Sequence, residues 1–214
     1  MKHPPPALEH YCRLVADAPL SVTALPDHAA IWRELVADAL RARPLIGESL
    51  PELVVDVGSG NGSPGIPLAI DYGRPVTLLE AASRKAAFLR RVVAELGIEA
   101  VVVAERSEHY ARAAGRDRFD LVLARALAPP SVAAELCLPL ARPGGRVVLW
   151  TGQPPLPEVA QVAGLLGGEL GRVEGVGGDR HLVELRKLAA TPERFPRRPG
   201  VARKRPLASL PSTS

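Results

Sequence analysis

The sequence contains few of the residues on which disulfide-rich and metal-binding proteins depend. Only two of its 214 residues are cysteines, Cys12 and Cys137, and neither belongs to a C-x-x-C pair. This excludes a disulfide framework, and we expect two buried free thiols in a reducing compartment. The five histidines do not have the spacing of zinc ligands, so we expect no metal site.

Long apolar segments are also missing. No stretch approaches the roughly 20 continuous apolar residues that a transmembrane helix needs. Residues 1–6 lack the apolar core of a signal peptide. We therefore expect a cytoplasmic protein with no membrane partner. A length of 214 residues is enough for one α/β domain with a small extension, which we expect to be a monomer.

Aromatic residues are scarce, and basic residues are in slight excess. Aromatic side chains make up 4% of the sequence, so stacking on nucleic-acid bases is expected to be limited. The formal net charge is +4 and the sequence pI is about 9.4. Such a modest excess does not by itself indicate a nucleic-acid partner.

Hydrophobic periodicity divides most of the chain into a helical extension and an α/β domain. Residues 7–45 have helical spacing, clearest over 27–42, where Asp27 is a candidate N-cap, and residues 1–48 are expected to form an N-terminal helical extension. Residues 49–190 alternate between short apolar runs and helical segments, and Ser83 is a candidate cap of one helix. This alternation predicts an α/β fold with a doubly wound, Rossmann-like parallel sheet and helices on both faces. The expected strands are 53–57, 75–79, 98–104, 119–124, 146–150, 169–176 and 181–188, and the expected helices include 83–96 and 156–166.

The end of the chain has a different composition. Residues 191–214 are rich in proline and basic residues and have no apolar periodicity. We expect this basic tail to be extended or disordered when the protein is alone.

The stretch after the first expected strand fits two nucleotide-binding patterns. Its residues satisfy D-x-G-x-G-x-G through Asp56, Gly58, Gly60 and Gly62, and G-x-G-x-x-G from Gly60 to Gly65. The first pattern is typical of S-adenosylmethionine-dependent methyltransferases, and the second of dinucleotide-binding proteins. In a dinucleotide fold the first glycine closely follows the strand, and here that residue is Gly58.

The placement of this loop favours the methyltransferase pattern. Counted from Gly58, the third glycine position holds Ser63, and Pro64 and Pro67 each lack an N–H that a pyrophosphate would use. S-adenosylmethionine has no phosphate, and glycines let its methionine part approach the backbone closely. NAD and a glycine turn without a ligand are the weaker alternatives.

Charged residues at the end of one expected strand and after three others suit this cofactor. Asp56 can receive the ammonium group of the ligand, and Glu80 can accept the ribose hydroxyls of either cofactor. Glu108 can accept the adenine amino group, or it is an exposed acid at a helix start. Arg125 ends the fourth strand, where ligands collect in open α/β sheets. Its partner is a ligand carboxylate, an RNA phosphate or the acid of a structural salt bridge.

Several segments together resemble one known family. The longest covers residues 56–68 (D-V-G-S-G-N-G-S-P-G-I-P-L), and its P-G-I-P-L end is more specific than the glycine pattern. The other segments are L-L-E at 78–80, R-K-x-x-F-L at 84–89, A-R-A at 124–126, E-L-C-L-P-L at 135–140, G-G at 144–145, D-R-H-L-V at 179–183 and T-P-x-x-F-P-R-R-P-G at 191–200. Over about residues 20–207, the chain resembles the bacterial 16S rRNA guanine-N7 methyltransferases (RsmG, formerly glucose-inhibited division protein B).

The resemblance implies a class I methyltransferase sheet and methyl transfer from S-adenosyl-L-methionine to guanine N7 in 16S rRNA of the small ribosomal subunit. Arg125 is the expected catalytic residue. The residues expected to bind the cofactor are Asp56, Gly58, Ser59, Gly60, Gly62, Pro64, Gly65, Glu80, Ala81, Ser107, Glu108 and Arg125. The residues expected to bind RNA are Arg84, Lys85, Arg180, Arg197, Arg198, Arg203 and Lys204.

Two departures from the family pattern leave other functions open. Thr151 stands where members usually carry an active-site lysine, and Glu34 replaces the histidine of an Arg-His pair. One alternative is a methyltransferase that acts on another RNA site or on a small molecule. The other is an rRNA-binding assembly factor with impaired catalysis.

Overall fold

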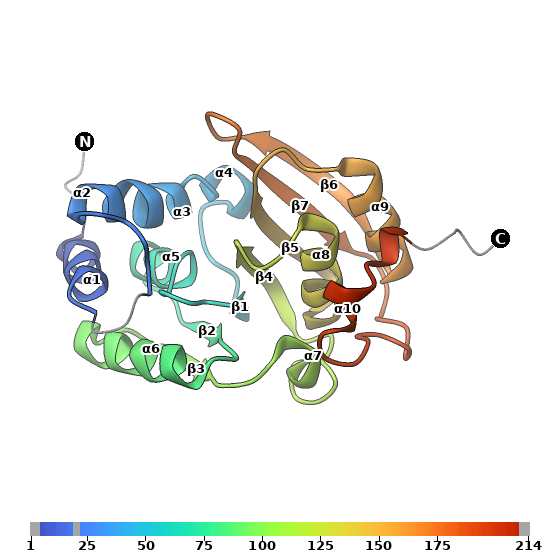
Figure 1. Ribbon diagram of the computed structural model, residues 1–214, viewed down its shortest axis with the longest axis horizontal. Coiled ribbons are helices and arrows are strands. Elements are labelled where there is room, and N and C mark those ends of the chain that lie inside the picture. Colours follow the sequence, from blue (N-terminus) through green and yellow to red (C-terminus); the bar gives the residue numbers. More distant parts are fainter. Residues whose placement is uncertain (1–4, 19–21, 210–214) are drawn as a thin grey trace. The chain divides into compact units, whose positions relative to one another are not determined.

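The computed structural model describes residues 5–18 and 22–209. The chain forms two compact units, Met1–Glu105 and Arg106–Ser214, and each is described by itself (Figure 1). Neither unit ends at the boundaries expected from the sequence, 48/49 and 190/191, which stay predictions. Among the described residues, no helix combines the length and apolarity needed to cross a membrane.

The first unit begins with the expected helical extension. Asp27 caps its second helix, since its Oδ1 accepts the Ala30 N–H at 2.8 Å. The helical region ends at Gly47, which has a φ of 99°. The described residues before position 49 contain no strand. The helices are α1 (Pro6–Ala16), α2 (His28–Ile31), the π-helix η1 (Trp32–Ala37), α3 (Asp38–Leu40) and α4 (Arg43–Ile46).

Three parallel strands of this unit are linked by two crossover helices. Strand β2 pairs with both β1 and β3, in registers such as Val55↔Thr77 and Leu78↔Val102. Parallel strands require such crossovers because the chain must return to the edge of the sheet where the previous strand began, and a tight turn joins only antiparallel strands. Ser83 is the first residue of its helix and provides no side-chain cap, so that detail of the prediction is wrong. These elements are β1 (Val54–Val57), α5 (Gly65–Tyr72), β2 (Val76–Leu79), α6 (Ser83–Leu96) and β3 (Ala100–Val103).

The second unit contains four strands, and not all of them are parallel. Strand β5 pairs in parallel with β4, whereas β7 is antiparallel to both β5 and β6. The entirely parallel sheet expected from the sequence is therefore wrong at β7, which runs antiparallel to both of its neighbours. Residues 176–180 join β6 to β7, and only antiparallel strands can be joined by so short a turn. The strands are β4 (Phe119–Arg125), β5 (Ala141–Thr151), β6 (Gly168–Gly175) and β7 (His181–Lys187).

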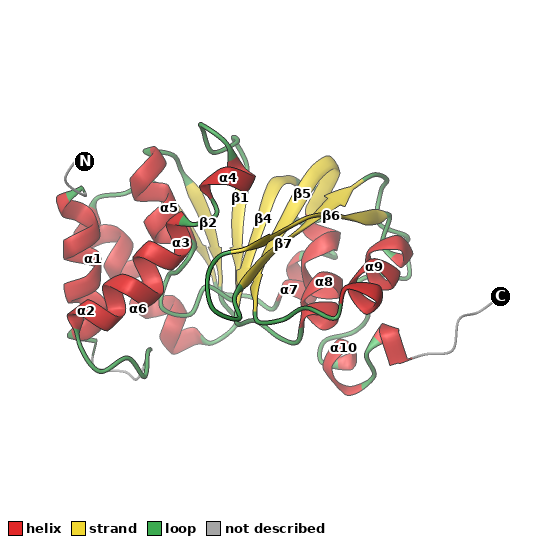
Figure 2. Cartoon of the chain, turned by 90° about the horizontal axis from the view of Figure 1, so that it is seen from above, coloured by secondary structure: helices red, strands yellow, loops and turns green. Residues whose placement is uncertain are grey.

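Helices cover the strands of the second unit. Helices α8 and α9 pack against β5 and β6 respectively (Figure 2). The strand order is β3-β2-β1 within the first unit and β4-β5-β7-β6 within the second. The predicted α/β class is thus confirmed. The remaining helices of this unit are α7 (Ser107–Tyr110), α8 (Pro130–Cys137), η2 (Leu138–Leu140), α9 (Leu156–Leu165), α10 (Val201–Lys204) and η3 (Leu207–Ser209).

Both cysteines are buried free thiols, as predicted. Burial, reinforced by the nearby Glu9, raises the pKa of Cys12 to about 12. A thiol with so high a pKa stays protonated near neutral pH and is a poor nucleophile.

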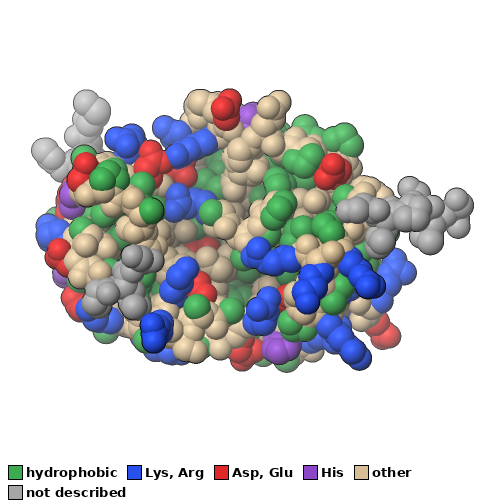
Figure 3. Space-filling model, viewed as in Figure 1, with side chains coloured by type: hydrophobic (Ala, Val, Ile, Leu, Met, Phe, Trp, Pro, Cys, Tyr) green, Lys and Arg blue, Asp and Glu red, His purple; other side chains and the backbone are tan. Residues whose placement is uncertain are grey.

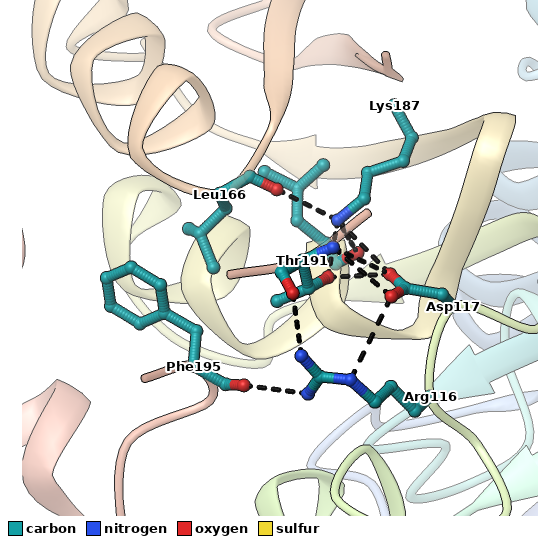
Figure 4. Close-up of polar contacts among 7 residues, drawn as sticks. Arg116, Asp117, Leu166, Lys187, Thr191 and Phe195 are labelled. Atoms are coloured by element: carbon teal, nitrogen blue, oxygen red, sulfur yellow. Dashed lines mark hydrogen bonds and ion pairs between the residues drawn. The ribbon is translucent and has the colours of Figure 1, made fainter. Parts of the chain in front are cut away.

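The described part of the basic tail is folded, contrary to the sequence prediction. Phe195, Ala202 and Leu207 are buried, and residues 201–204 form α10. The tail begins at a buried polar cluster around Lys187 (Figure 4). The Lys187 ammonium, fully buried, donates to Thr191 Oγ1 at 2.5 Å and to the Leu166 carbonyl at 2.8 Å. Periodicity could not indicate this packing because most of its contacts are polar and join distant parts of the chain.

Candidate cofactor-binding site

The glycine loop turns sharply at the end of β1. Gly58, Gly60 and Gly62 have φ angles of 71°, 54° and 101°, in the region that other residues rarely adopt. The N–H groups of Gly58 and Ser59 donate to the Leu79 carbonyl at 2.7 and 3.2 Å. The loop is thereby fixed to the end of β2, which brings it next to the residue that follows Leu79.

That residue is Glu80, and its carboxylate is part of the loop. Glu80 is 8% exposed, and its Oε2 accepts the Gly60 N–H at 2.9 Å while Oε1 accepts the Ala82 N–H at 2.8 Å. A carboxylate offers about four lone-pair positions. Two are used by the backbone, and the other two are left for the hydroxyls of a ribose. Ala81, which lies between Glu80 and Ala82 in the chain, is exposed.

Asp56 joins the loop to the start of α5. Its carboxylate is buried, and Oδ2 accepts the Gly65 N–H at 3.1 Å. A Cβ atom on Gly65 would lie 2.9 Å from that same oxygen, so only glycine permits this approach. An acid at a helix N-terminus is also favoured by the helix dipole. The ammonium-binding role of Asp56 stays a prediction.

Two contacts from the helical extension hold the other side of the loop. The Ser63 hydroxyl donates to the Leu35 carbonyl at 2.8 Å, and the Tyr11 hydroxyl donates to the Asn61 carbonyl at 3.2 Å. The sequence analysis missed this supporting role of the extension. The loop-side residue Ser63 was visible in the motif, but its partner is a backbone carbonyl that no sequence pattern marks.

In the second unit, Glu108 lies in a buried polar site. Glu108 and Ser107 are 5% and 9% exposed, so the alternative of an exposed helix-start acid is wrong. Glu108 Oε1 accepts the Gly200 N–H at 3.0 Å, and Oε2 lies 3.5 Å from Arg106 Nε. Burial alone raises the pKa of Glu108, but the Gly200 and own-backbone hydrogen bonds and Arg106 together hold the pKa below its ordinary value. The acid is therefore ionised and able to accept further hydrogen bonds.

Arg125 is the last residue of β4 and is half-buried. The next residue, Ala126, has a φ of 51°, a strained conformation for a residue other than glycine. Such strain persists only where surrounding structure enforces it, and it is frequent at functional sites. Thr151 is the last residue of the neighbouring β5, so both positions lie at the carboxyl ends of parallel strands.

Six of the residues expected to bind RNA are exposed: Arg84, Lys85, Arg180, Arg198, Arg203 and Lys204. Arg197 is half-buried. Arg197 and Arg203 both have partners within the second unit. Arg197 binds Glu135 through two nitrogens, and Arg203 donates to the Leu127 carbonyl at 2.6 Å. The space-filling view shows basic side chains gathered over the region of α7 and α10 (Figure 3).

The structure thus assembles the expected residues in two places. In the first unit, the glycine loop surrounds the carboxylate of Glu80. In the second, Ser107 and Glu108 are joined to the folded tail, and Arg125 ends β4.

Comparisons with solved structures place the fold. An MtNAS variant determined with S-adenosylmethionine has a TM-score of 0.60 at 18% identity, covering 86% of this chain and 72% of that one. T. thermophilus RsmC, a 16S rRNA N2 methyltransferase determined with AdoMet and guanosine, has a TM-score of 0.50 at 22% identity, covering 73% of this chain and 40% of that one. With the glycine loop and Glu80, these likenesses define the fold as that of the class I methyltransferases.

The family is identified by sequence. The family model described as rRNA small subunit methyltransferase G matches residues 6–176. A Chloroflexus aggregans protein named ribosomal RNA small subunit methyltransferase G is 41% identical over 198 residues, which cover 87% of this chain and 82% of that protein. A Synechococcus protein of the same name is 36% identical over 203 residues, covering 87% and 78%. The chain belongs to the rRNA small subunit methyltransferase G family, as its motifs predicted.

Proposed function

We propose that this protein transfers a methyl group from S-adenosyl-L-methionine to N7 of a guanine in 16S rRNA of the small ribosomal subunit. Membership of the methyltransferase G family carries this proposal. It also favours methylation of 16S rRNA over the two alternatives that the Thr151 and Glu34 departures left open. A ribosomal RNA substrate implies action in the cytoplasm. The expected monomeric state and the expected lack of a metal stay predictions.

The cofactor is S-adenosyl-L-methionine, and the geometry of the glycine loop suits it. Glu80 has lone pairs left for the ribose hydroxyls after binding the Gly60 and Ala82 N–H groups. The positive φ angles of the loop let the backbone approach the methionine part of the ligand. Asp56 would face the ammonium group, and Glu108 the adenine amino group. The proposed cofactor residues also include Ser59, Pro64, Gly65, Ala81, Ser107 and Arg125.

The proposed reaction requires little acid–base chemistry from the protein. When bound, S-adenosyl-L-methionine supplies an electrophilic methyl group on its sulfonium sulfur. Guanine N7 has an in-plane lone pair and, in RNA, no proton to remove, so the protein needs no general base. Its contribution is to align the two reactants, and good alignment lowers a barrier by up to roughly 7–11 kcal/mol.

Arg125 is the residue proposed to act at the reaction site. It lies at the carboxyl end of β4, the edge at which ligands bind in open α/β sheets. Its guanidinium can hold a cofactor carboxylate or an RNA phosphate near the methyl group in a bidentate geometry.

The exposed basic side chains are proposed to hold the RNA backbone. Arg84 and Lys85 lie in the first turn of α6, and Arg198 and Lys204 lie on the folded tail. Phosphate contacts of this kind position an RNA without reading its sequence and weaken steeply with salt. Arg180, also exposed, is a further proposed RNA contact.

Methyl transfer to defined RNA substrates tests this function. The protein would be incubated with radiolabelled S-adenosyl-L-methionine and either naked 16S rRNA or small subunits from a strain that lacks the endogenous enzyme. Chemical cleavage at N7-methylguanosine should then give a single site in the 16S rRNA. Label at another atom or in another molecule would support the first alternative. Cofactor binding without any label would support the assembly factor.

A further inference from the structure

The tail is fastened to the second unit at its beginning. We name residues 191–205 the C-terminal clamp. The Thr191 hydroxyl binds both the Lys187 ammonium and Asp117 Oδ1, at 2.5 and 2.6 Å. Arg116 binds the carbonyls of Thr191 and Phe195, at 2.6 and 2.8 Å (Figure 4). These contacts fix the direction in which the clamp leaves β7.

A buried ion pair fixes the middle of the clamp. Arg197 Nε and Nη2 donate to the two oxygens of Glu135, each at 2.6 Å. The Glu135 side chain is 1% exposed and the Arg197 side chain 19%. Arg197 Nη2 also donates to the Arg205 carbonyl at 2.8 Å, which joins the two ends of the α10 turn. A guanidinium engaged in this way has few donors left for an RNA phosphate.

The turn held by Arg197 contacts two parts of the proposed active site. The Gly200 N–H donates to Glu108 Oε1 at 3.0 Å, and Arg203 donates to the carbonyl of Leu127 at 2.6 Å. Leu127 is two residues beyond Arg125 in the strained turn after β4. Between Gly200 and Arg203 in the chain, Ala202 packs in one buried cluster with Val132 and Leu136 of α8.

We propose that the C-terminal clamp positions the cofactor-binding acid Glu108 and the turn after Arg125, with Arg197, Gly200 and Arg203 as its positioning residues. This inference rests on the proposed function, because Glu108 is a cofactor ligand only in a methyltransferase. Under it, Arg197 and Arg203 serve cofactor binding rather than contact with rRNA phosphates. The exposed Arg198 and Lys204 keep the proposed RNA role.

Exchanging Arg197 for lysine separates the two roles. R197K keeps the positive charge, which suffices for a phosphate, but it cannot make the two parallel bonds to Glu135. A misplaced Glu108 loses a charge-assisted hydrogen bond to the adenine, which corresponds to a rise in the Kd for S-adenosyl-L-methionine of about 10- to 100-fold. The matched control is R194K, the same exchange at an exposed position of the clamp, which should leave this Kd unchanged. Both values would be measured by isothermal titration calorimetry, without RNA.

A double-mutant cycle shows whether the effect passes through Glu108. If it does, R197K raises the Kd strongly in the wild-type background and little in an E108Q background. The proposal would be overturned if R197K and E108Q raised the Kd by independent factors that multiply in the double variant. It would also be overturned if R197K left the Kd unchanged but weakened binding to 16S rRNA.

A second variant covers the outcome in which R197K does not fold. Gly200 has a φ of 80°, and a Cβ atom there would meet nothing within 4 Å. G200A therefore leaves the packing intact, but alanine is strained at this φ, so we expect the backbone to relax and weaken the bond from its N–H to Glu108. The same cycle with G200A then decides. Failure of the proposed function can be distinguished from failure of this inference. In the first case the methyl-transfer assay would give no N7-methylguanosine, while the Kd values for S-adenosyl-L-methionine would still follow the cycle.

Discussion

The carboxylate of Glu80 offers the sharpest test of the cofactor site. In E80Q one oxygen becomes an NH2 group, which cannot accept a hydrogen bond. In the wild-type protein the Gly60 and Ala82 N–H groups each donate to one of the two Glu80 oxygens, at 2.9 and 2.8 Å. In E80Q one of these N–H groups therefore loses its acceptor. The substitution therefore disturbs the loop even though it hardly changes the size of the side chain.

The magnitude follows from the bonds that are lost. The loss of one of these part-buried hydrogen bonds lowers the unfolding free energy by about 0.5–1.5 kcal/mol. A hydrogen bond from a ribose hydroxyl to a charged acceptor contributes about 1.5–3 kcal/mol to binding, so its loss raises the Kd for S-adenosyl-L-methionine about 10- to 150-fold. Calorimetric titration measures the Kd, and urea unfolding of the ligand-free protein measures the stability.

Glu99 provides the matched control, because it is exposed in the same unit. E99Q should leave both the Kd and the unfolding free energy within error of the wild type. If E80Q binds the cofactor within threefold of the wild type, the ribose-binding role of Glu80 is refuted. A lower stability with an unchanged Kd would mean that Glu80 supports the loop and does not touch the ligand.

Three further predictions concern the loop, the buried lysine and the exposed cations. G65A should lower the unfolding free energy by about 1–3 kcal/mol, because its Cβ would meet the Asp56 carboxylate at 2.9 Å; an unchanged urea midpoint would contradict this. Burial, opposed by Asp117, lowers the pKa of Lys187 to about 8. Between about pH 8 and 10.4 the Lys187 side chain therefore holds a proton in the unfolded chain but not in the folded one. The unfolding free energy of the wild type, compared with that of K187M, should rise with pH across this window. A difference in urea-unfolding free energy that does not change with pH would refute this prediction. The double variant R198A/K204A should weaken rRNA binding and lower the slope of log K against log salt by about 1.4–1.8, with cofactor affinity unchanged.

The elements that the sequence predicted well are those with local signals. β1 begins one residue after its expected start, and the loop after it could be identified from its glycines and from Glu80 alone. The antiparallel direction of β7 was missed, although Gly177 and Gly178, both with positive φ, mark the tight turn before it. A closer consideration of that turn would have predicted the hairpin.

The contacts that the sequence did not predict connect residues far apart in the chain. Ser63 and Leu35 are 28 residues apart, and Gly200 and Glu108 are 92 apart. In both pairs one partner is a backbone group, which any residue type provides, so no side-chain pattern marks it. Folding of the tail also depends on single, partly buried arginine contacts, whereas prediction from periodicity needs a repeated apolar face.

The bond between Gly200 and Glu108 can form only late in synthesis of the second unit. The chain is made from its N-terminus, so Glu108 leaves the peptidyl-transferase centre 92 residues before its partner. At about 5–20 residues per second, this interval lasts roughly 5 to 20 seconds. For that time the carboxylate has only water and its near neighbours as hydrogen-bond donors. A newly made molecule therefore completes the surroundings of Glu108, the proposed adenine-binding acid, only after every strand of the sheet has been translated.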